Sequence, residues 1–249
     1  MFARHRLFGF RAVIGDAVCI KIPGPLLDVN YAARLVREYL EKDGDGRFRY
    51  SGAYFERLAG GGDRPEVAYQ VTAEDLLAVS MLSVRVIRYY ALDVLVYQAR
   101  DVSDLLTQIP VDVSLADAGA EELIADGGPA SRLWTLLHDI KPPLERSRLG
   151  PVAAGKLLAR KRPQLIPVYD SYVKKALDRP RVDETFWRDL RCQLTRDTSL
   201  VSDLEAVRAR VGEPAAHLSV LRVFDIMCWM HEGRQQADWA QSWPPGPEA

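Results

Sequence analysis

Residues 148–177, RLGPVAAGKLLARKRPQLIPVYDSYVKKAL, combine a Gly-Pro turn, two helical patterns and a run of basic residues. The first helical pattern begins at Gly150-Pro151, because proline fits the first helical position and glycine lets the backbone approach a partner closely. Prolines then end this pattern, and the second begins at Asp170, an ordinary type of helix N-cap residue. The stretch therefore predicts two short helices, the first with an open N-terminus and the second with an aspartate at its start.

Helical spacing also dominates the remainder of the chain, whereas strand-like composition is confined to RLFGFRAVI and VCIKI near its start. Thr72 precedes Asp75 at the spacing of a capping box, which marks the start of a helix. We predict an all-α fold with a short irregular or β-leaning N-terminal segment. The predicted helices cover approximately residues 29–41, 71–87, 91–108, 116–125, 129–139, 151–160, 169–177, 183–194, 199–210 and 217–232.

Size and composition favour one folded domain. The 249 residues are 48% hydrophobic, enough for a buried core, and no repeat or long linker divides them. We expect one mostly helical domain over residues 1–243 and a disordered tail, PPGPEA, over residues 244–249. No apolar run resembles the core of a signal peptide or approaches the roughly 20 residues of a membrane helix. These features predict a cytoplasmic protein that does not enter a membrane.

The positions of cysteine and histidine do not indicate a metal site. Cys19, Cys192 and Cys228 are scattered and odd in number, which argues against a disulfide framework and against a zinc or iron–sulfur site. The histidines have no partners at ligand spacing. We therefore expect buried thiols and no bound metal.

Two further stretches are predicted to be structural. AGGGDRPEVAYQ, residues 59–70, lacks the glycine fingerprints of dinucleotide-binding and P-loop sites and indicates a surface loop. HLSVLRVFDIMCWMHEG, residues 217–233, is apolar nearly all round and indicates a core helix. The aromatic residues of the C-terminal region are likewise predicted to be structural: Phe224, Trp229, Trp239 and Trp243.

Charge is unevenly distributed along the chain. Residues 141–181 contain eleven Lys and Arg against three Asp and Glu, a net charge of +8, although the whole chain carries −1. A basic segment on an otherwise acidic protein favours a polyanion, and double-stranded DNA is the expected partner. In the plainer alternative, these side chains form the solvated faces of two helices. The candidate DNA-binding residues are Arg148, Gly150, Arg160, Lys161, Arg162 and Lys174.

The segments LGPVAAGKLLA and PVYDSYV together resemble the hairpin-and-aspartate signature of helix-hairpin-helix DNA glycosylases. In that superfamily a glycine turn opens one helix, and a catalytic aspartate stands at the start of the next. With Gly150 on the second glycine of the hairpin, Asp170 falls on the catalytic aspartate. The resemblance implies a glycosylase-like helical fold and the removal of a damaged or modified base from DNA.

Departures from the superfamily pattern restrict the chemistry that the resemblance implies. Arg148 stands where the first hairpin glycine is usual, and Val152 stands where members that also cut the DNA backbone carry a Schiff-base lysine. Lys156, one helical turn later, is an imperfect substitute under a shifted alignment. The four-cysteine cluster motif of some members is absent. The resemblance thus implies a monofunctional hydrolase with Asp170 as its catalytic carboxylate and without a cofactor.

The implied reaction also requires a pocket for the excised base. A carboxylate such as that of Asp170 would stabilise oxocarbenium-like charge on the sugar or orient the attacking water. The target base must leave the DNA stack, so aromatic side chains should line the pocket that receives it. The candidate pocket residues are Tyr169, Tyr172 and Trp134, together with the group formed by Tyr50, Tyr54 and Phe55.

A second and closer resemblance covers the whole chain but brings no activity with it. GGGDRPEV, LLTQIPVDV and LLARKRPQLIPVYDS resemble segments of a bacterial family catalogued as a domain of unknown function. Two other functions therefore stay open. In one, a non-catalytic DNA-binding module grips phosphate with the Gly150 hairpin and uses Asp170 only as a cap. In the other, the helical fold is a scaffold for a protein partner. The target base and the oligomeric state are also open.

Overall fold

A computed structural model describes residues 20–86, 88–139, 150–179 and 185–240, with side chains as far as residue 235. Within these ranges the fold is helical and contains no β-strand, which confirms the predicted all-α class. The β-pairing present there is one isolated antiparallel bridge between Lys42 and Phe48. Most of the strand-like N-terminal composition and the predicted disordered tail lie outside the described residues.

Most helices lie close to their predicted positions, with three differences. The helix predicted over 217–232 continues to Ala240. The helix predicted over 71–87 ends at Ser80, and Ser83 beyond it adopts a left-handed φ of 61° that no helix can contain. The helix predicted over 91–108 is divided by a π-helical turn at Asp93–Tyr97. The α-helices are α1 Val29–Tyr39, α2 Ala73–Ser80, α3 Arg88–Leu92, α4 Ala99–Leu106, α5 Ala120–Ile124, α6 Pro129–Asp139, α7 Pro151–Lys161, α8 Ser171–Ala176, α9 Thr185–Arg196, α10 Thr198–Val211 and α11 Val220–Ala240. Across the described ranges, none of them is both long and apolar enough to cross a lipid bilayer.

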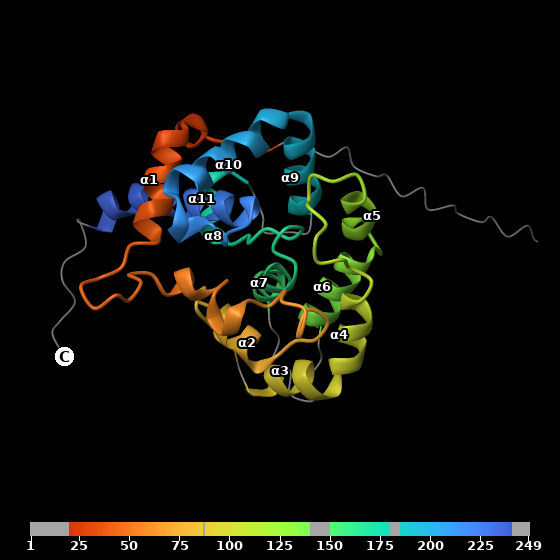
Figure 1. The fold of residues 1–249 in the computed structure, drawn as a ribbon. Helices are drawn as coiled ribbons and strands as arrows, with labels where there is room; N and C mark the ends of the chain where they lie inside the picture. The colour runs from red at the N-terminus through yellow and green to blue at the C-terminus, as the bar shows by residue number, and fades with distance from the viewer. Residues whose placement is uncertain (1–19, 87, 140–149, 180–184, 241–249) are drawn as a thin grey trace, which may run out of the picture.

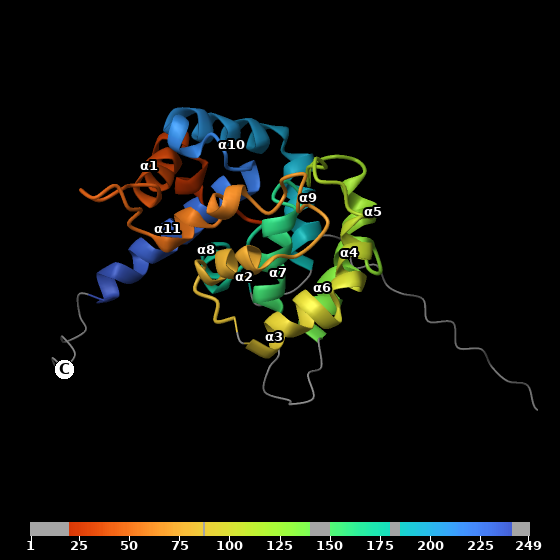
Figure 2. The same cartoon turned by 60° about the horizontal axis from the view of Figure 1, so that its bottom comes forward.

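α7 lies in the middle of the molecule. Figure 1 views it nearly along its axis, with α1, α8, α10 and α11 on one side and α2 and α3 on the other. α7 packs against α2 and α6, while α11 packs against α1, α8 and α10 (Figures 1 and 2). One cluster of buried apolar side chains extends through both groups of helices. The sequence that opens with the Gly-Pro turn therefore supplies the central helix of the fold.

Side-chain caps explain where several helices begin. The carboxylate of Asp28 accepts backbone N–H groups in the first turn of α1. Thr72 and Asp75 form the predicted capping box at the start of α2, each side chain binding the other residue's backbone N–H. Asp170 caps α8 in the same manner as Asp28 caps α1.

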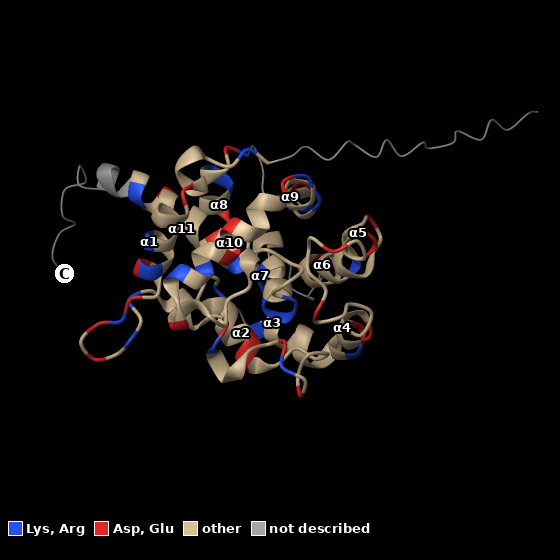
Figure 3. Cartoon of the chain, turned by 45° about the horizontal axis from the view of Figure 1, so that its top comes forward, with Lys and Arg blue, Asp and Glu red and all other residues tan. Residues whose placement is uncertain are grey.

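The basic run at the C-terminal end of α7 is buried. Arg160, Lys161 and Arg162 are only 3%, 0% and 1% exposed. The prediction that these three residues contact DNA phosphate is wrong, because a phosphate could reach them only if the surrounding core opened. Figure 3 shows basic positions distributed over many helices, including α7 in the interior, rather than gathered on one face.

One aspartate and a set of backbone carbonyls hold these three cations, which we call the cationic cluster. Arg160 Nε and Lys161 Nζ pair with the two carboxylate oxygens of Asp75 at 3.2 and 3.0 Å. Burial lowers the pKa of Lys161 and lowers the pKa of Arg162 to about 10. The carbonyls that accept hydrogen bonds from the cluster belong to Phe55, Leu58, Gly62, Val67, Ala68, Leu106 and Ile109.

The glycine-rich segment 59–70 is a partly exposed loop, as predicted, but its buried residues belong to this interior arrangement, so it is not a plain surface loop. A Cβ atom on Gly62 would lie 2.6 Å from the carbonyl oxygen of Arg160 and 2.7 Å from Asp75 Oδ1. Glycine is required because the backbone passes directly against the cationic cluster. The segment wraps α7 and supplies carbonyl oxygens to it.

We predict that Lys161→Met lowers the free energy of unfolding by about 3–5 kcal/mol, because it leaves two buried carbonyls without a partner and removes one of the two cations that Asp75 binds. Lys21→Met replaces an exposed lysine by the same residue and should change that free energy by less than about 0.5 kcal/mol. Urea denaturation of the two variants and the wild type provides the measurement. Equal stability of the two variants would show that the cationic cluster does not hold the fold together.

Candidate active site

A cavity of about 640 Å³ opens between the first turn of α7 and the C-terminal helix α11. Its wall also includes parts of α1, segments 50–52 and 81–84, and the start of α8. Its lining combines apolar and aromatic side chains with a few polar groups, which is typical of small-molecule pockets. This cavity contains Asp170 and Lys156, the two predicted catalytic residues, and is therefore the candidate active site.

Lys156 and Asp170 form an ion pair in this cavity. Lys156 Nζ lies 3.1 Å from Asp170 Oδ2 and donates a second hydrogen bond of 2.9 Å to the carbonyl oxygen of Leu82. The Lys156 side chain is 5% exposed and that of Asp170 is 17% exposed, so the carboxylate has the greater contact with the cavity. Sequence reasoning named both residues, and the fold brings them together.

Asp170 also caps α8. One of its carboxylate oxygens binds the helix N-terminus, and the other binds Lys156. Oδ1 accepts the backbone N–H groups of Tyr172 and Val173 at 3.0 and 3.2 Å, whereas Oδ2 faces Lys156. The cap fixes the carboxylate in position without consuming both oxygens. The plain structural role and a chemical role of Asp170 are therefore compatible.

Lys156 acts here as a charge partner. Its ammonium group is held between a carboxylate and a carbonyl, so its nitrogen is a donor and not a free nucleophile. Val152, which stands where the glycosylase resemblance would expect a Schiff-base lysine, lines the same cavity but has no amine. This arrangement gives no support to Schiff-base chemistry by either residue.

Aromatic side chains form one wall of the cavity. Tyr39 and Tyr50 stack with ring centroids 5.4 Å apart, and Trp229 meets both rings edge-on. Tyr172 lies against Trp229 with centroids 5.3 Å apart. Tyr172 and Tyr50 were predicted pocket residues, whereas Trp229 was predicted to be structural and in fact lines the cavity.

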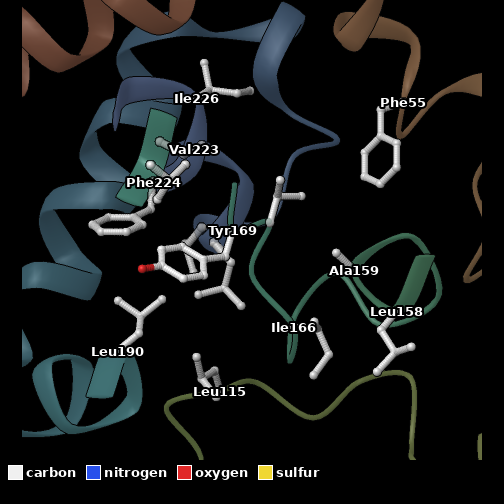
Figure 4. Close-up of a cluster of buried hydrophobic side chains, with 14 of the residues drawn as sticks. Phe55, Leu115, Leu158, Ala159, Ile166, Tyr169, Leu190, Val223, Phe224 and Ile226 are labelled. Carbon is white, nitrogen blue, oxygen red and sulfur yellow. The ribbon is translucent and has the colours of Figure 1, made fainter. Parts of the chain in front are cut away.

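The other aromatic candidates lie elsewhere. Tyr169 is buried in the core and stacks on Phe186 with centroids 3.8 Å apart. Figure 4 shows its ring among Leu190, Val223 and Phe224. Trp134 is half-buried outside the cavity, where its indole N–H donates to the carbonyl oxygen of Pro151. Their prediction as pocket residues is therefore wrong.

Phe55 and Tyr54, from the remaining candidate group, also do not line this cavity. Phe55 is buried in the core. Tyr54 packs edge-on against Phe48 and accepts a hydrogen bond from the Phe48 N–H.

A second charged group, which we call the Arg222 cluster, borders the same cavity and was missed by sequence reasoning. Arg222 pairs with Asp225 Oδ1 through Nη1 and with Glu56 Oε1 through Nε, both at 2.5 Å. Its Nη2 donates to the hydroxyl of Tyr39 at 2.9 Å. The available signal was the sequence VLRVFDIMCW, where an arginine and an aspartate three residues apart interrupt an apolar helix.

The Arg222 cluster holds two carboxyl groups against one guanidinium. The side chains of Arg222, Glu56 and Asp225 are 6%, 11% and 2% exposed. Burial raises the pKa of Glu56 and raises the pKa of Asp225 well above its usual range, and it raises the pKa of Tyr39 to about 12. Arg222 is the cation in contact with both carboxyl groups, Arg160 also acts on Glu56, and burial outweighs these charges, so a protonated carboxyl group is favoured in the cluster.

The remaining predicted DNA-binding residues lie near the rim of the cavity or outside the described part. Gly150 is exposed, lines the cavity and is the N-cap of α7, with no side chain capping that helix. Lys174 is half-buried on α8. Arg148 lies outside the described residues. The described rim thus combines an open helix N-terminus with an aromatic wall, and much of the predicted cationic footprint lies in the interior.

Comparison with known proteins identifies the family of the chain. The model of DUF6308, described as a family of unknown function, matches residues 32–232, so the chain belongs to that family. No curated protein and no solved structure gave a significant match. Among the described residues, no group of three or more His, Cys, Asp or Glu side chains is placed to hold a metal ion.

We predict that the stability of Asp225→Asn rises relative to the wild type as the pH increases from about 5 to 8. The folded wild type holds a proton that its unfolded chain releases above about pH 4, so rising pH favours the unfolded wild type. Asparagine has no such proton. Urea denaturation at several pH values measures the difference.

The control for this prediction is Asp112→Asn, which changes an exposed aspartate by the same substitution. Its stability difference from the wild type should stay constant over that pH range. A constant difference for Asp225→Asn as well would contradict proton retention by the Arg222 cluster.

Proposed function

We propose that the protein is a monofunctional DNA N-glycosylase in which Asp170 is the catalytic carboxylate. The observation that carries this proposal is the placement of the Lys156–Asp170 ion pair inside an aromatic-walled cavity, next to the open N-terminus of α7. The hairpin-and-aspartate resemblance supports the same function, because it assigns catalysis to Asp170 independently of the cavity.

The cavity suits an extruded nucleotide in size and in chemistry. A base flipped out of a duplex needs a pocket with aromatic or apolar faces, and Tyr39, Tyr50, Tyr172 and Trp229 offer such faces. Its volume of about 640 Å³ lies within the range of pockets that bury small ligands. A sugar bound at the mouth would bring its anomeric carbon toward Asp170.

Asp170 has the properties that the proposed reaction requires. Breaking an N-glycosidic bond develops positive charge on the sugar, and a fixed carboxylate stabilises that charge or orients the attacking water. The α8 cap fixes the Asp170 carboxyl group in position, and Lys156 Nζ binds its second oxygen. With no free amine beside the sugar site in the described residues, hydrolysis is favoured over backbone cleavage.

DNA binding would rest on fewer charges than the sequence alone indicates. The backbone N–H groups at the start of α7 offer an anion site at the cavity rim. Arg160, Lys161 and Arg162 are excluded from that surface by their burial. We therefore expect a modest salt dependence of binding, corresponding to a small number of phosphate contacts.

A non-catalytic DNA-binding module is the second candidate function. It is favoured by one observation, that capping of α8 accounts by itself for the presence of Asp170 at this position. In this function the cavity would receive a base or a helix end without breaking any bond. Product analysis separates the two candidates, because only the first releases a free base.

We predict that Asp170→Asn reduces the rate of base release by at least about 100-fold, since the charged carboxylate acts on the transition state. Asparagine is an equally good N-cap, but the variant removes the charge partner of Lys156, so urea denaturation must first show that it is folded under the assay conditions. Duplexes that each carry one modified base serve as substrates, and the released base is quantified by chromatography under single-turnover conditions.

The matched control is Asp197→Asn, which changes another N-cap aspartate, that of α10, by the same substitution. Asp197 is not among the residues that line the cavity, so its variant should release bases at the wild-type rate. Full activity of Asp170→Asn would refute its catalytic role. Absence of base release by the wild type from every substrate would favour the non-catalytic module.

A further inference from the structure

Exposed apolar side chains gather on one short part of the described surface. Among the described residues, seven large apolar side chains are exposed, and four of them lie between positions 89 and 97: Tyr89, Leu92, Val96 and Tyr97. Val96 and Tyr97 are the most exposed of the seven, at 60% and 74%. An apolar patch on a soluble protein marks an interaction site, whereas single exposed apolar residues need no explanation. We call these four residues the apolar strip.

Helical spacing places the apolar strip on the outer side of α3 and of the π-helical turn that follows it. Tyr89, Leu92 and Val96 are three and four residues apart and so share one helix face, whereas Tyr90 and Val94 are buried on the other face. Figure 1 shows α3 at the edge of the molecule, across α7 from α10 and α11. The strip therefore faces away from the core.

Charges of opposite sign occupy the two halves of the segment that carries the apolar strip. Residues 85–92 contain two arginines and no acidic residue, a net charge of +2. Residues 93–104 contain one arginine and three aspartates, a net charge of −2. Arg88 and Asp101 are exposed on either side of the strip, and the Arg88 guanidinium lies 4.9 Å from the centre of the Tyr89 ring. The segment therefore has no net charge but has a basic half and an acidic half.

This charge pattern distinguishes between possible partners. DNA or an anionic lipid surface would be attracted by one half of the segment and repelled by the other. A second copy of the segment, running in the opposite direction, would place each half on the half of opposite sign. Two-fold symmetric interfaces bring the same surface of two subunits together in this way. The charges therefore favour a second copy of this chain.

We propose that the apolar strip is the interface of a symmetric dimer, in which Arg88 of one copy faces Asp101 of the partner subunit. The strip supplies the apolar centre of this interface, and the charged residues supply its rim, which is the usual composition of contacts between protein chains. The inference is independent of the proposed glycosylase function. The strip does not line the candidate active site, so its variants test the dimer without altering that cavity.

The first test compares Leu92→Asp with a matched control, Leu27→Asp. The two leucines are about equally exposed, at 46% and 48%, but Leu27 lies in the 3₁₀ turn Gly24–Leu27, outside the strip. Sedimentation equilibrium over about a hundredfold range of protein concentration gives the dissociation constant of each dimer. Circular dichroism shows whether each variant keeps the helix content of the wild type.

We expect the wild type and Leu27→Asp to form dimers with similar dissociation constants. Leu92→Asp should raise the dissociation constant at least about 30-fold, because it places a charge in the apolar centre of the interface. A monomeric wild type, a Leu92→Asp variant that dimerises as tightly as the wild type, or an equal effect of the two variants would overturn the inference.

The second test reverses charges at exposed positions, where substitutions have little effect on folding. Arg88→Glu and Asp101→Arg each place like charges across the proposed interface, so each alone should weaken the dimer at least about threefold. The double variant restores opposite charges and should dimerise within about twofold of the wild type. The strip separates Arg88 from Asp101 within one chain, so this recovery requires contact between copies. Losses that add in the double variant would overturn the inference, even if Leu92→Asp fails to fold.

Discussion

The burial of three consecutive cations at the end of α7 is the constraint on which the rest of the structure depends. Charged side chains are costly to bury unless each is paired or fully hydrogen-bonded, and here one aspartate serves two cations. The remaining donors reach carbonyl oxygens in segments 55–68 and 106–109. These segments must therefore wrap α7, which makes it the central helix.

The same constraint positions the candidate active site. Lys156 and Arg160 are four residues apart and lie on one face of α7, the face that packs on α2. Arg160 binds Asp75 within α2, and Lys156 binds the Leu82 carbonyl just beyond α2. With α7 fixed in rotation, Lys156 points into the cavity and meets Asp170 at the start of α8. On α11, Arg222 and Asp225 also line the cavity. The cavity thus has one carboxyl group paired with a lysine and one held in a buried cluster with Arg222 and Glu56.

Local features of the sequence predicted the helices and their caps, but they did not predict which charges are buried. The Thr72–Asp75 capping box was visible as a spacing, whereas the second role of Asp75 depends on residues far away in the chain. The basic run was predicted to lie on the surface because the sequence shows no acidic partners for most of its donors. Its acceptors are mostly backbone carbonyls, which every residue has and which the sequence therefore cannot indicate. Gly62 is required where the backbone passes against Arg160 and Asp75, but the run of three glycines that contains it was interpreted as a surface loop.

The candidate site was also predictable only in part, because local spacing indicates single residues but not their distant contacts. Asp170 and Lys156 were identified through a spacing pattern, and the two residues do meet. Tyr169 and Trp229 were assigned to the wrong environments, because the choice between core and cavity depends on how α8 and α11 pack. Arg222 and Asp225 interrupt an otherwise apolar helix and so indicated a buried charged cluster. An analysis of hydrophobic periodicity does not detect such a cluster, because it considers only the apolar positions.

The central claim is that the cavity beside Asp170 receives a nucleotide extruded from DNA. Its most direct test is fluorescence anisotropy of the protein with an undamaged duplex and with a matching duplex that carries an abasic-site analogue, across a series of salt concentrations. The account predicts tighter binding to the analogue and a salt dependence corresponding to a few phosphate contacts. Failure to bind either duplex at low salt would contradict the account and direct the search toward a protein partner.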